Sequence, residues 1–356
     1  MSSLLKKKQI QKFDPNGVGQ KGRLFGLPFT PETAEVVVIP VPWDVTASFT
    51  DGTSLGPKAI LDVSSQIDLY LPNIPNAWQL GISMLPIDAG WVKENRRARK
   101  HATEYIKYLE EADGTGQSDR DINLILNNIN ALSRNINEWV HGRSCELLEA
   151  GKIPAVVGGD HSSPLGLMQA VNGMNNAFGV LQIDAHADLR PAYEGFTHSH
   201  ASIMHNLLEL DHVEKLVQLG IRDFCEQEAS VMESNPRIVT FFDHELKKQE
   251  FEGVSWSAQV SQIIEELPDD IYITVDIDGL EAYYCPGTGT PVPGGLSYSQ
   301  LIYLFDKIAA SGKRILAFDI CEVCGNQGQW DAIVGSRILY YLSSITGISN
   351  KLLFLR

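Results

Sequence analysis

Seven short apolar runs, separated by longer segments of helical character, constrain the fold of this 356-residue chain more than any other feature. Most of the runs are apolar at consecutive positions, which is typical of strands buried on both faces of a parallel sheet. Between them, residues 121–151 carry apolar side chains at helical spacing and end at Gly151. This alternation predicts an α/β fold in which helices cover the sheet. The runs are residues 34–42, 153–159, 177–184, 214–221, 236–243, 270–278 and 314–323.

No feature of the sequence divides the chain into two domains. It contains no internal repeat and no low-complexity linker, and the polar stretch 111–120 has the composition of an exposed loop inside an insertion. We therefore expect a single domain over residues 34–356. Residues 1–33 precede the first predicted strand, and we expect them to be an N-terminal extension that wraps over the domain surface or a neighbour.

Composition excludes several classes of partner. The net charge of −15 argues against a nucleic-acid partner, because phosphate contacts need clustered lysine and arginine. No window approaches the ~20 apolar residues of a membrane span, and the N-terminal lysines are not followed by the apolar segment of a secretory signal. Five cysteines, an odd number, favour reduced thiols and a cytoplasmic protein. A lone Cys321-x-x-Cys324 pair is more typical of packing at a strand end than of zinc.

Histidines and acidic residues gather where four predicted strands end. In an open parallel sheet, ligands bind at the carboxyl ends of the strands. Alternate residues of an extended chain share one face, so the three polar residues of D-A-H-A-D (184–188) are expected to point the same way, as are the two of D-I-D (276–278). The residues concerned are His161; Asp184, His186 and Asp188; Asp276 and Asp278; and Asp319 and Glu322.

Six of these residues, four carboxylates and two imidazoles, exceed the four ligands of a typical zinc site. They suit two divalent ions that share bridging carboxylates, and the oxygen-rich donor set favours manganese, nickel, cobalt or iron. Two such ions carry +4, which balances the four carboxylates. Metal binding lowers the pKa of a shared water toward neutrality, so the sequence predicts a hydrolytic centre.

The same segments resemble the ureohydrolase superfamily, which contains arginase, agmatinase, guanidinobutyrase, formimidoylglutamase and guanidine hydrolase. The resemblance covers roughly residues 34–356. It implies a three-layer α/β/α fold around a mainly parallel eight-stranded sheet, assembled as a homo-oligomer, a trimer or hexamer. The matching segments are G-T-S-L-G-P-K-A-I (52–60), G-G-D-H-S (158–162), D-A-H-A-D (184–188), S-H-A-S (199–202), D-I-D-G-L (276–280), P-G-T-G-T-P-V-P-G-G (286–295) and Glu322.

The resemblance also assigns roles to single residues. It implies that Glu322 pairs with a planar guanidinium and that Asp188 passes a proton to the leaving nitrogen. His200 aligns with the family's proton-shuttling histidine, and His198 takes that role if the loop has a different register. The implied ligands are His161, Asp184, Asp188 and Asp276 for one ion, and Asp184, His186, Asp276 and Asp278 for the other, with manganese or nickel as the metal.

The substrate is expected to be a small cationic guanidino compound that releases urea. Leu189 to Tyr193 replace the polar groups with which arginases hold the α-amino and α-carboxyl groups of arginine, so arginine is disfavoured. Residues 42–46, P-W-D-V-T, resemble nickel-dependent guanidine hydrolases, and Thr46 is expected to close the pocket by hydrogen bonding. The alternative is that Trp43 and Thr46 only pack a corner. The bulky 281–285 segment, in place of the L-D-P of agmatinases, also fits a closed pocket.

We therefore predict hydrolysis of guanidine to urea and ammonia, with agmatine and 4-guanidinobutyrate as alternative substrates. A catalytically silent subunit of a hetero-oligomer is an alternative of another class. Such a subunit would have lost at least one metal ligand, whereas all six and Glu322 are present.

Overall fold

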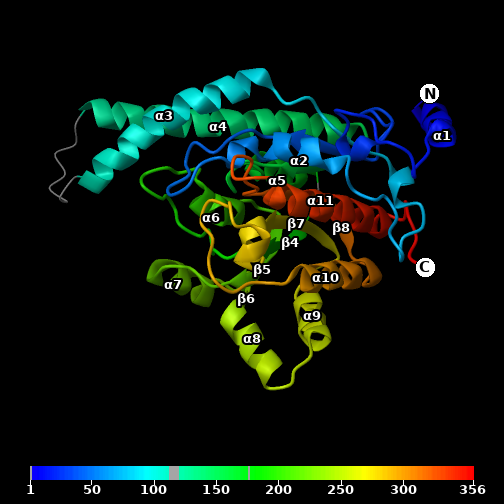
Figure 1. Ribbon diagram of the computed structural model, residues 1–356. Coiled ribbons are helices and arrows are strands. Elements are labelled where there is room, and N and C mark those ends of the chain that lie inside the picture. The colour runs from blue at the N-terminus through cyan, green and yellow to red at the C-terminus, as the bar shows by residue number, and fades with distance from the viewer. Residues whose placement is uncertain (1, 112–119, 175–176) are drawn as a thin grey trace.

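The computed structural model describes residues 2–111, 120–174 and 177–356, and its centre is one sheet (Figure 1). Eight strands follow the order β2-β1-β3-β8-β7-β4-β5-β6, and every neighbouring pair is parallel. Because all strands run the same way, their carboxyl ends lie along one edge. The strands are β1 (Val36–Pro40), β2 (Ile82–Met84), β3 (Ile153–Val157), β4 (Phe178–Ile183), β5 (Val213–Ile221), β6 (Ile238–Phe242), β7 (Asp270–Asp276) and β8 (Arg314–Cys321).

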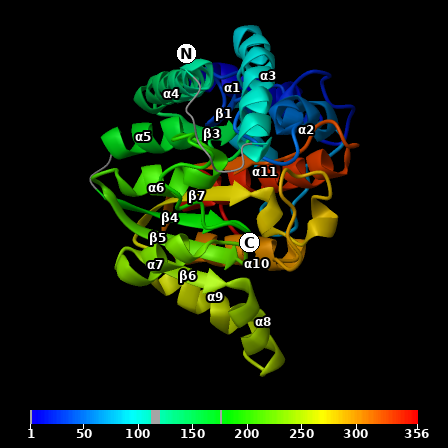
Figure 2. The same ribbon diagram turned by 90° about the vertical axis from the view of Figure 1, so that its left-hand side faces the viewer.

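Helices cover both faces of the sheet, which confirms the three-layer α/β/α prediction (Figure 2). One face packs against α2 (Gly56–Ser64), α9 (Trp256–Glu265), α10 (Tyr298–Ala310) and α11 (Trp330–Ser349). The other packs against α3 (Ala89–Glu111), α4 (Arg120–Glu149), α5 (Leu165–Met174) and α6 (Ile203–Leu208). The shorter helices α7 (Glu226–Ser234) and α8 (Asp243–Phe251) lie beside the edge strand β6. Among the described residues, no helix has the length and apolar character needed to span a bilayer.

All seven predicted strands are present, and the helix predicted over 121–151 is α4. Strand β4 shows why the runs are apolar at consecutive positions: Phe178 and Val180 enter one core, whereas Leu181 and Ile183 enter the other. The prediction missed β2, because three residues are too short to show a pattern. The loop predicted at 111–120 lies, apart from its two end residues, outside the described residues.

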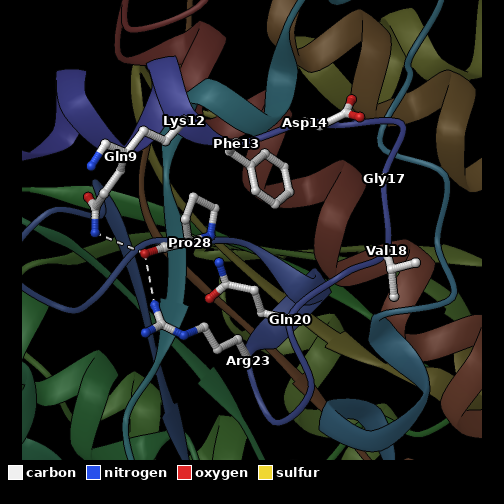
Figure 3. A pocket seen from close by; sticks show the side chains of 9 residues that line it. All are labelled: Gln9, Lys12, Phe13, Asp14, Gly17, Val18, Gln20, Arg23 and Pro28. Atoms are coloured by element: carbon white, nitrogen blue, oxygen red, sulfur yellow. Dashed lines mark hydrogen bonds between the residues drawn. The ribbon is translucent and has the colours of Figure 1, made fainter.

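The N-terminal extension packs against the edge of the domain that carries β1 and β2. From α1 (Ser2–Lys12), Lys6 forms an ion pair with Glu35 (2.6 Å) and donates to the Leu80 carbonyl (2.7 Å). Figure 3 shows a surface pocket of about 460 Å³ between α1 and the following loop, where Gln9 and Arg23 both donate to the Pro28 carbonyl. Of these contacts, those of Lys6 join the extension to the residues before β1 and β2, whereas the bonds to Pro28 lie within the extension, whose Leu24, Phe25, Leu27 and Phe29 are buried in the core.

Candidate metal centre

The first group of candidate ligands surrounds His161, which lies in the loop after β3. Its Nδ1 is 2.9 Å from Asp184 Oδ2, 3.0 Å from Asp188 Oδ2 and 3.4 Å from Asp276 Oδ2. These side chains come from the ends of β3, β4 and β7, and all four are almost completely buried. The structure therefore brings together the four residues that the resemblance implies for one ion. The tightest cluster is His161, Asp184 and Asp188, with Asp276 at its border.

A second group shares Asp184 with the first. His186 Nδ1 lies 3.1 Å from Asp278 Oδ2 and 3.6 Å from Asp184 Oδ1. One carboxylate oxygen of Asp184 thus faces each histidine, as a bridging ligand requires. His186 is the most exposed of this group, with 23% of its side chain accessible, so this half of the centre faces the open side of the site.

The extended geometry expected for D-A-H-A-D and D-I-D is wrong in its details. Strand β4 ends at Ile183, Asp188 has a φ of 55°, and Asp278 lies in the 3-10 helix η5 (Ile277–Gly279). The physical reason is local: Asp184 accepts the backbone N–H of His186 (2.7 Å), and Asp276 accepts that of Asp278 (2.9 Å). Such i to i+2 bonds curl the chain after the strand, and this curl, rather than alternation, turns the ligands together.

The hydrogen bonds of His161 indicate that a cation fits between these side chains. The hydroxyl of Thr274 donates to Asp319 Oδ1 (2.9 Å), so it accepts from His161 Nε2–H (2.8 Å). This arrangement leaves the lone pair of Nδ1 facing three carboxylates. Among the described residues, neither His161 Nδ1 nor Asp278 Oδ2 has a hydrogen-bond partner, although both atoms are buried. A positive ion in each of the two groups would satisfy these atoms.

The electrostatics of the site point the same way. Burial, and then the charge of Asp278, raises the pKa of Asp276 well above its usual range, and burial and the charge of Asp160 do the same for Glu322. Burial would lower the pKa of His161, but the neighbouring carboxylates of Asp184 and Asp188 raise it well above its usual value. The cluster thus attracts protons because it lacks positive charge, and two divalent cations and a cationic substrate would supply that charge.

A buried polar network lies beneath the ligands, on the face of the sheet that carries α5. Gln182 Nε2 donates to Asp184 Oδ2 (2.8 Å) and Gln218 Nε2 donates to Gln182 Oε1 (2.7 Å). The predicted cluster member Asp319 belongs to this network: it accepts from Thr274 and from the Tyr272 hydroxyl (2.7 Å), away from the ligands. Sequence reasoning missed Gln182 and Thr274. The available signal was their position, a polar residue two places before the first aspartate of each ligand motif.

Glu322 faces a small cavity at the end of β8. Its φ of 60° is unusual for a residue with a side chain, and Asp188 shares this left-handed conformation. Glu322 Oε1 accepts the backbone N–H of His161 (2.9 Å). The cavity is about 10 Å³, which is room for about one water-sized group. It is lined by Ala47, Ser48, Phe49, Thr50, His200, Gly289, Thr290 and Glu322.

A second cavity of about 150 Å³ shares Ser48, His200 and Thr290 with the first and extends to His186 and Asp188. Its wall also contains Arg190, which stacks over Tyr193 at 4.8 Å and forms an ion pair with Glu228 at 3.5 Å.

The structure separates the remaining predicted residues. His200, at the start of the 3-10 helix η4 (His200–Ser202), lines both cavities, whereas His198 lines neither and bonds to the Thr197 hydroxyl (3.0 Å). Thr46 also lines neither cavity; its hydroxyl is fully buried and donates to Asp160 Oδ2 (3.0 Å). The geometry therefore favours His200 over His198 as the shuttle and places Thr46 beneath the pocket wall.

Comparisons with known proteins agree with this geometry. The model of the Arginase family matches residues 34–343. The N(1)-aminopropylagmatine ureohydrolase of Thermus thermophilus is 30% identical over 318 residues, which is 89% of this chain and 92% of that protein. The agmatinase of Bacillus anthracis is 26% identical, over 82% of this chain and 84% of that protein. The agmatine ureohydrolase of Thermoplasma volcanium superposes with a TM-score of 0.66 over 97% of this chain and 99% of that chain, at 19% identity.

Proposed function

Because this chain belongs to the arginase family and is a hydrolase acting on guanidino compounds, we propose that its substrate is free guanidine, cleaved to urea and ammonia. One observation carries the proposal: the space beside Glu322 is about 10 Å³ and is walled by residues 47–50 and by Gly289 and Thr290. A guanidinium is larger than this space, so it would also occupy part of the adjoining 150 Å³ cavity, and the wall at residues 47–50 limits the room left for a tail beside Glu322.

The residues of the chain have distinct tasks in this reaction. Glu322, with one oxygen fixed by the His161 N–H, pairs with the guanidinium and orients its carbon toward the ligand cluster. We assign the six predicted residues, His161, Asp184, His186, Asp188, Asp276 and Asp278, to two divalent ions, manganese or nickel. When bound there, such ions would lower the pKa of a water molecule and so would supply the nucleophile. Asp188 passes a proton to the leaving nitrogen, and His200 exchanges protons with solvent.

Thr46 does not need to contact the substrate in this scheme. Its hydroxyl is bonded to Asp160, and residues 47–50 follow directly in the pocket wall. We propose that Thr46 positions this wall, and we expect the other properties implied by the resemblance, a homo-oligomer and a cytoplasmic location.

Agmatine-type substrates are the second candidate. The relatives named above act on agmatine or N(1)-aminopropylagmatine. In addition, the 150 Å³ cavity leads outward past Asp223, whose side chain is 66% exposed and could pair with an amine at the end of a tail. 4-Guanidinobutyrate would place a carboxylate there instead, which Asp223 disfavours.

Urea release from guanidine, agmatine, N(1)-aminopropylagmatine and 4-guanidinobutyrate, by protein loaded separately with manganese and nickel, tests the proposal. We expect kcat/KM for guanidine to exceed that for the tailed compounds by about tenfold or more. A preference for agmatine of that size would replace guanidine by the second candidate. If fully metal-loaded protein releases no urea from any of these compounds, the proposed activity is wrong and a catalytically silent subunit is favoured.

A further inference from the structure

Residues 43–52, which we call the pocket loop, connect β1 to the segment before α2 and form one wall of the cavity beside Glu322. Ala47, Ser48, Phe49 and Thr50 line that cavity. The hydroxyls of Ser48 and Thr50 make no hydrogen bond with the described residues, and Phe49 is 79% exposed. The tip of the loop therefore has few contacts of its own, and its position depends on how its base is held.

The base of the pocket loop is held from α3 by an amide–carboxylate pair. Asn95 Nδ2 donates to Asp44 Oδ1 (2.8 Å), and the Asp44 N–H donates back to Asn95 Oδ1 (2.9 Å). The other oxygen of Asp44 accepts the N–H groups of Gly52 and Ser54, both at 3.0 Å, which closes the loop into a ring. Asp44 and Asn95 are 2% and 5% exposed, so these bonds are shielded from water.

Arg99, one turn further along α3, lies on the same face of the helix as Asn95. Its Nη1 donates to the carbonyl oxygens of Val45 (3.2 Å) and Ala47, which lead directly to the loop tip. Trp91 of the same helix packs edge-on against Trp43, with ring centroids 5.9 Å apart. Trp91, Asn95 and Arg99 of α3 thus contact the part of the pocket loop that precedes the cavity wall.

We propose that Asn95 and Arg99 are positioning residues that hold the pocket loop against the substrate and so limit the size of the guanidino compound that binds. This inference rests on the proposed function, since it assigns the selectivity of that site to α3. Neither side chain lines either cavity, so their effect acts through the loop. A loop released from α3 would spend less time closed, which raises KM more than it lowers kcat.

Arg99→Gln and Asn95→Leu test the proposal, with Arg96→Gln, at an exposed position of the same helix, as the matched control. We expect both test variants to raise KM for guanidine about tenfold, with kcat changed less than about threefold, since hydrogen bonds of this kind each contribute about one power of ten. The ratio of activity on agmatine to activity on guanidine should rise. Amide hydrogen exchange over residues 43–52 should quicken in both test variants and stay unchanged in the control.

Unchanged exchange over residues 43–52 in both variants would overturn the proposal, as would a loss confined to kcat. If Arg99→Gln does not fold, Arg99→Lys, which retains the charge but not the forked geometry, should show the same effects in weaker form. Exchange is measured on the metal-loaded protein without substrate. It therefore decides the role of α3 even if no guanidino compound is hydrolysed, an outcome that would reject the proposed function alone.

Discussion

The two sides of the site are built in different ways. On the ligand side, His161, Asp184 and Asp276 stand at the ends of buried strands, and Thr274 and Gln182 of the same sheet hold His161 and Asp184 from below. On the opposite side, the wall is the pocket loop, which is held at its base by contacts from α3 and by the bond of Thr46 to Asp160. We expect the ligand side to be rigid because it is held by the sheet. The pocket loop can change position without moving any strand.

We therefore expect the ligand side to determine the reaction and the pocket loop to determine which substrate binds. The positions of the ligands follow from short motifs and from the parallel order of the strands. The shape of the wall depends on residues far apart in the sequence, such as Asp44 and Asn95, which are 51 positions apart. Substitutions on the ligand side should therefore remove metal and activity together, and those on the wall side should leave the metal in place.

Asp184→Asn should have the largest effect, because Asp184 belongs to both groups of candidate metal ligands. Loss of its charge leaves two histidines and the remaining carboxylates unable to hold two ions close together. We expect kcat/KM to fall by about 10³-fold or more, with metal content below two ions per chain. Metal analysis and urea release measure both quantities. Asp223→Asn, at the exposed mouth, serves as the control and should retain both ions; full metal loading of Asp184→Asn would contradict the shared-ligand assignment.

Glu322→Gln tests whether Glu322, which lies between the two sides, binds the substrate or the metal. The amide keeps the hydrogen bond from the His161 N–H but loses the charge that pairs with a guanidinium. We expect kcat/KM to fall by about 10²-fold through loss of this ion pair, while metal content and thermal stability stay close to those of the unmodified protein. If the variant instead loses its metal, Glu322 belongs with the ligands and not with the substrate.

The sequence predicted the ligand side far better than the wall. Strand runs are local and the ligand motifs follow them, so the sheet, its layers and the meeting of His161, Asp184 and Asp276 could all be predicted. The left-handed backbone of Asp188 and Glu322 could not, because it depends on how the chain turns after each strand. Nor could the pairing of Asp44 with Asn95, since nothing local to either residue selects the other. Thr46 illustrates the limit: it was expected to close the pocket by hydrogen bonding, but its hydroxyl is bonded to Asp160 and lines neither cavity.

Thr274→Val should have a smaller effect, confined to the ligand side. The substitution removes the hydroxyl that accepts from His161 Nε2–H and leaves that proton without an acceptor in a buried site, while Asp319 Oδ1 keeps only the bond from Cys321 Sγ (3.5 Å). Loss of such an outer partner lowers metal affinity by about 10- to 100-fold. Metal competition titrations with a chelator measure this change. Thr240→Val, which removes a partly buried hydroxyl that donates to Gln218 and not to His161, is the control. Equal affinities for Thr274→Val and the unmodified protein would mean that the sheet does not orient His161.

The smallest expected effect distinguishes the two histidines of the loop on the wall side. His200 lines both cavities, and burial, followed by the charge of His186 and His161, lowers its pKa to about 4. It is therefore neutral at pH 7 and able to accept a proton from the site. His198, which lines neither cavity, bonds only to Thr197 among the described residues. His200→Gln should lower kcat about tenfold at unchanged metal content, with part of the loss restored by added imidazole, and His198→Gln should change kcat less than twofold. If His198→Gln instead had the larger effect, His198 would be the proton shuttle. The loop that carries it would then have to move toward the cavities when substrate binds.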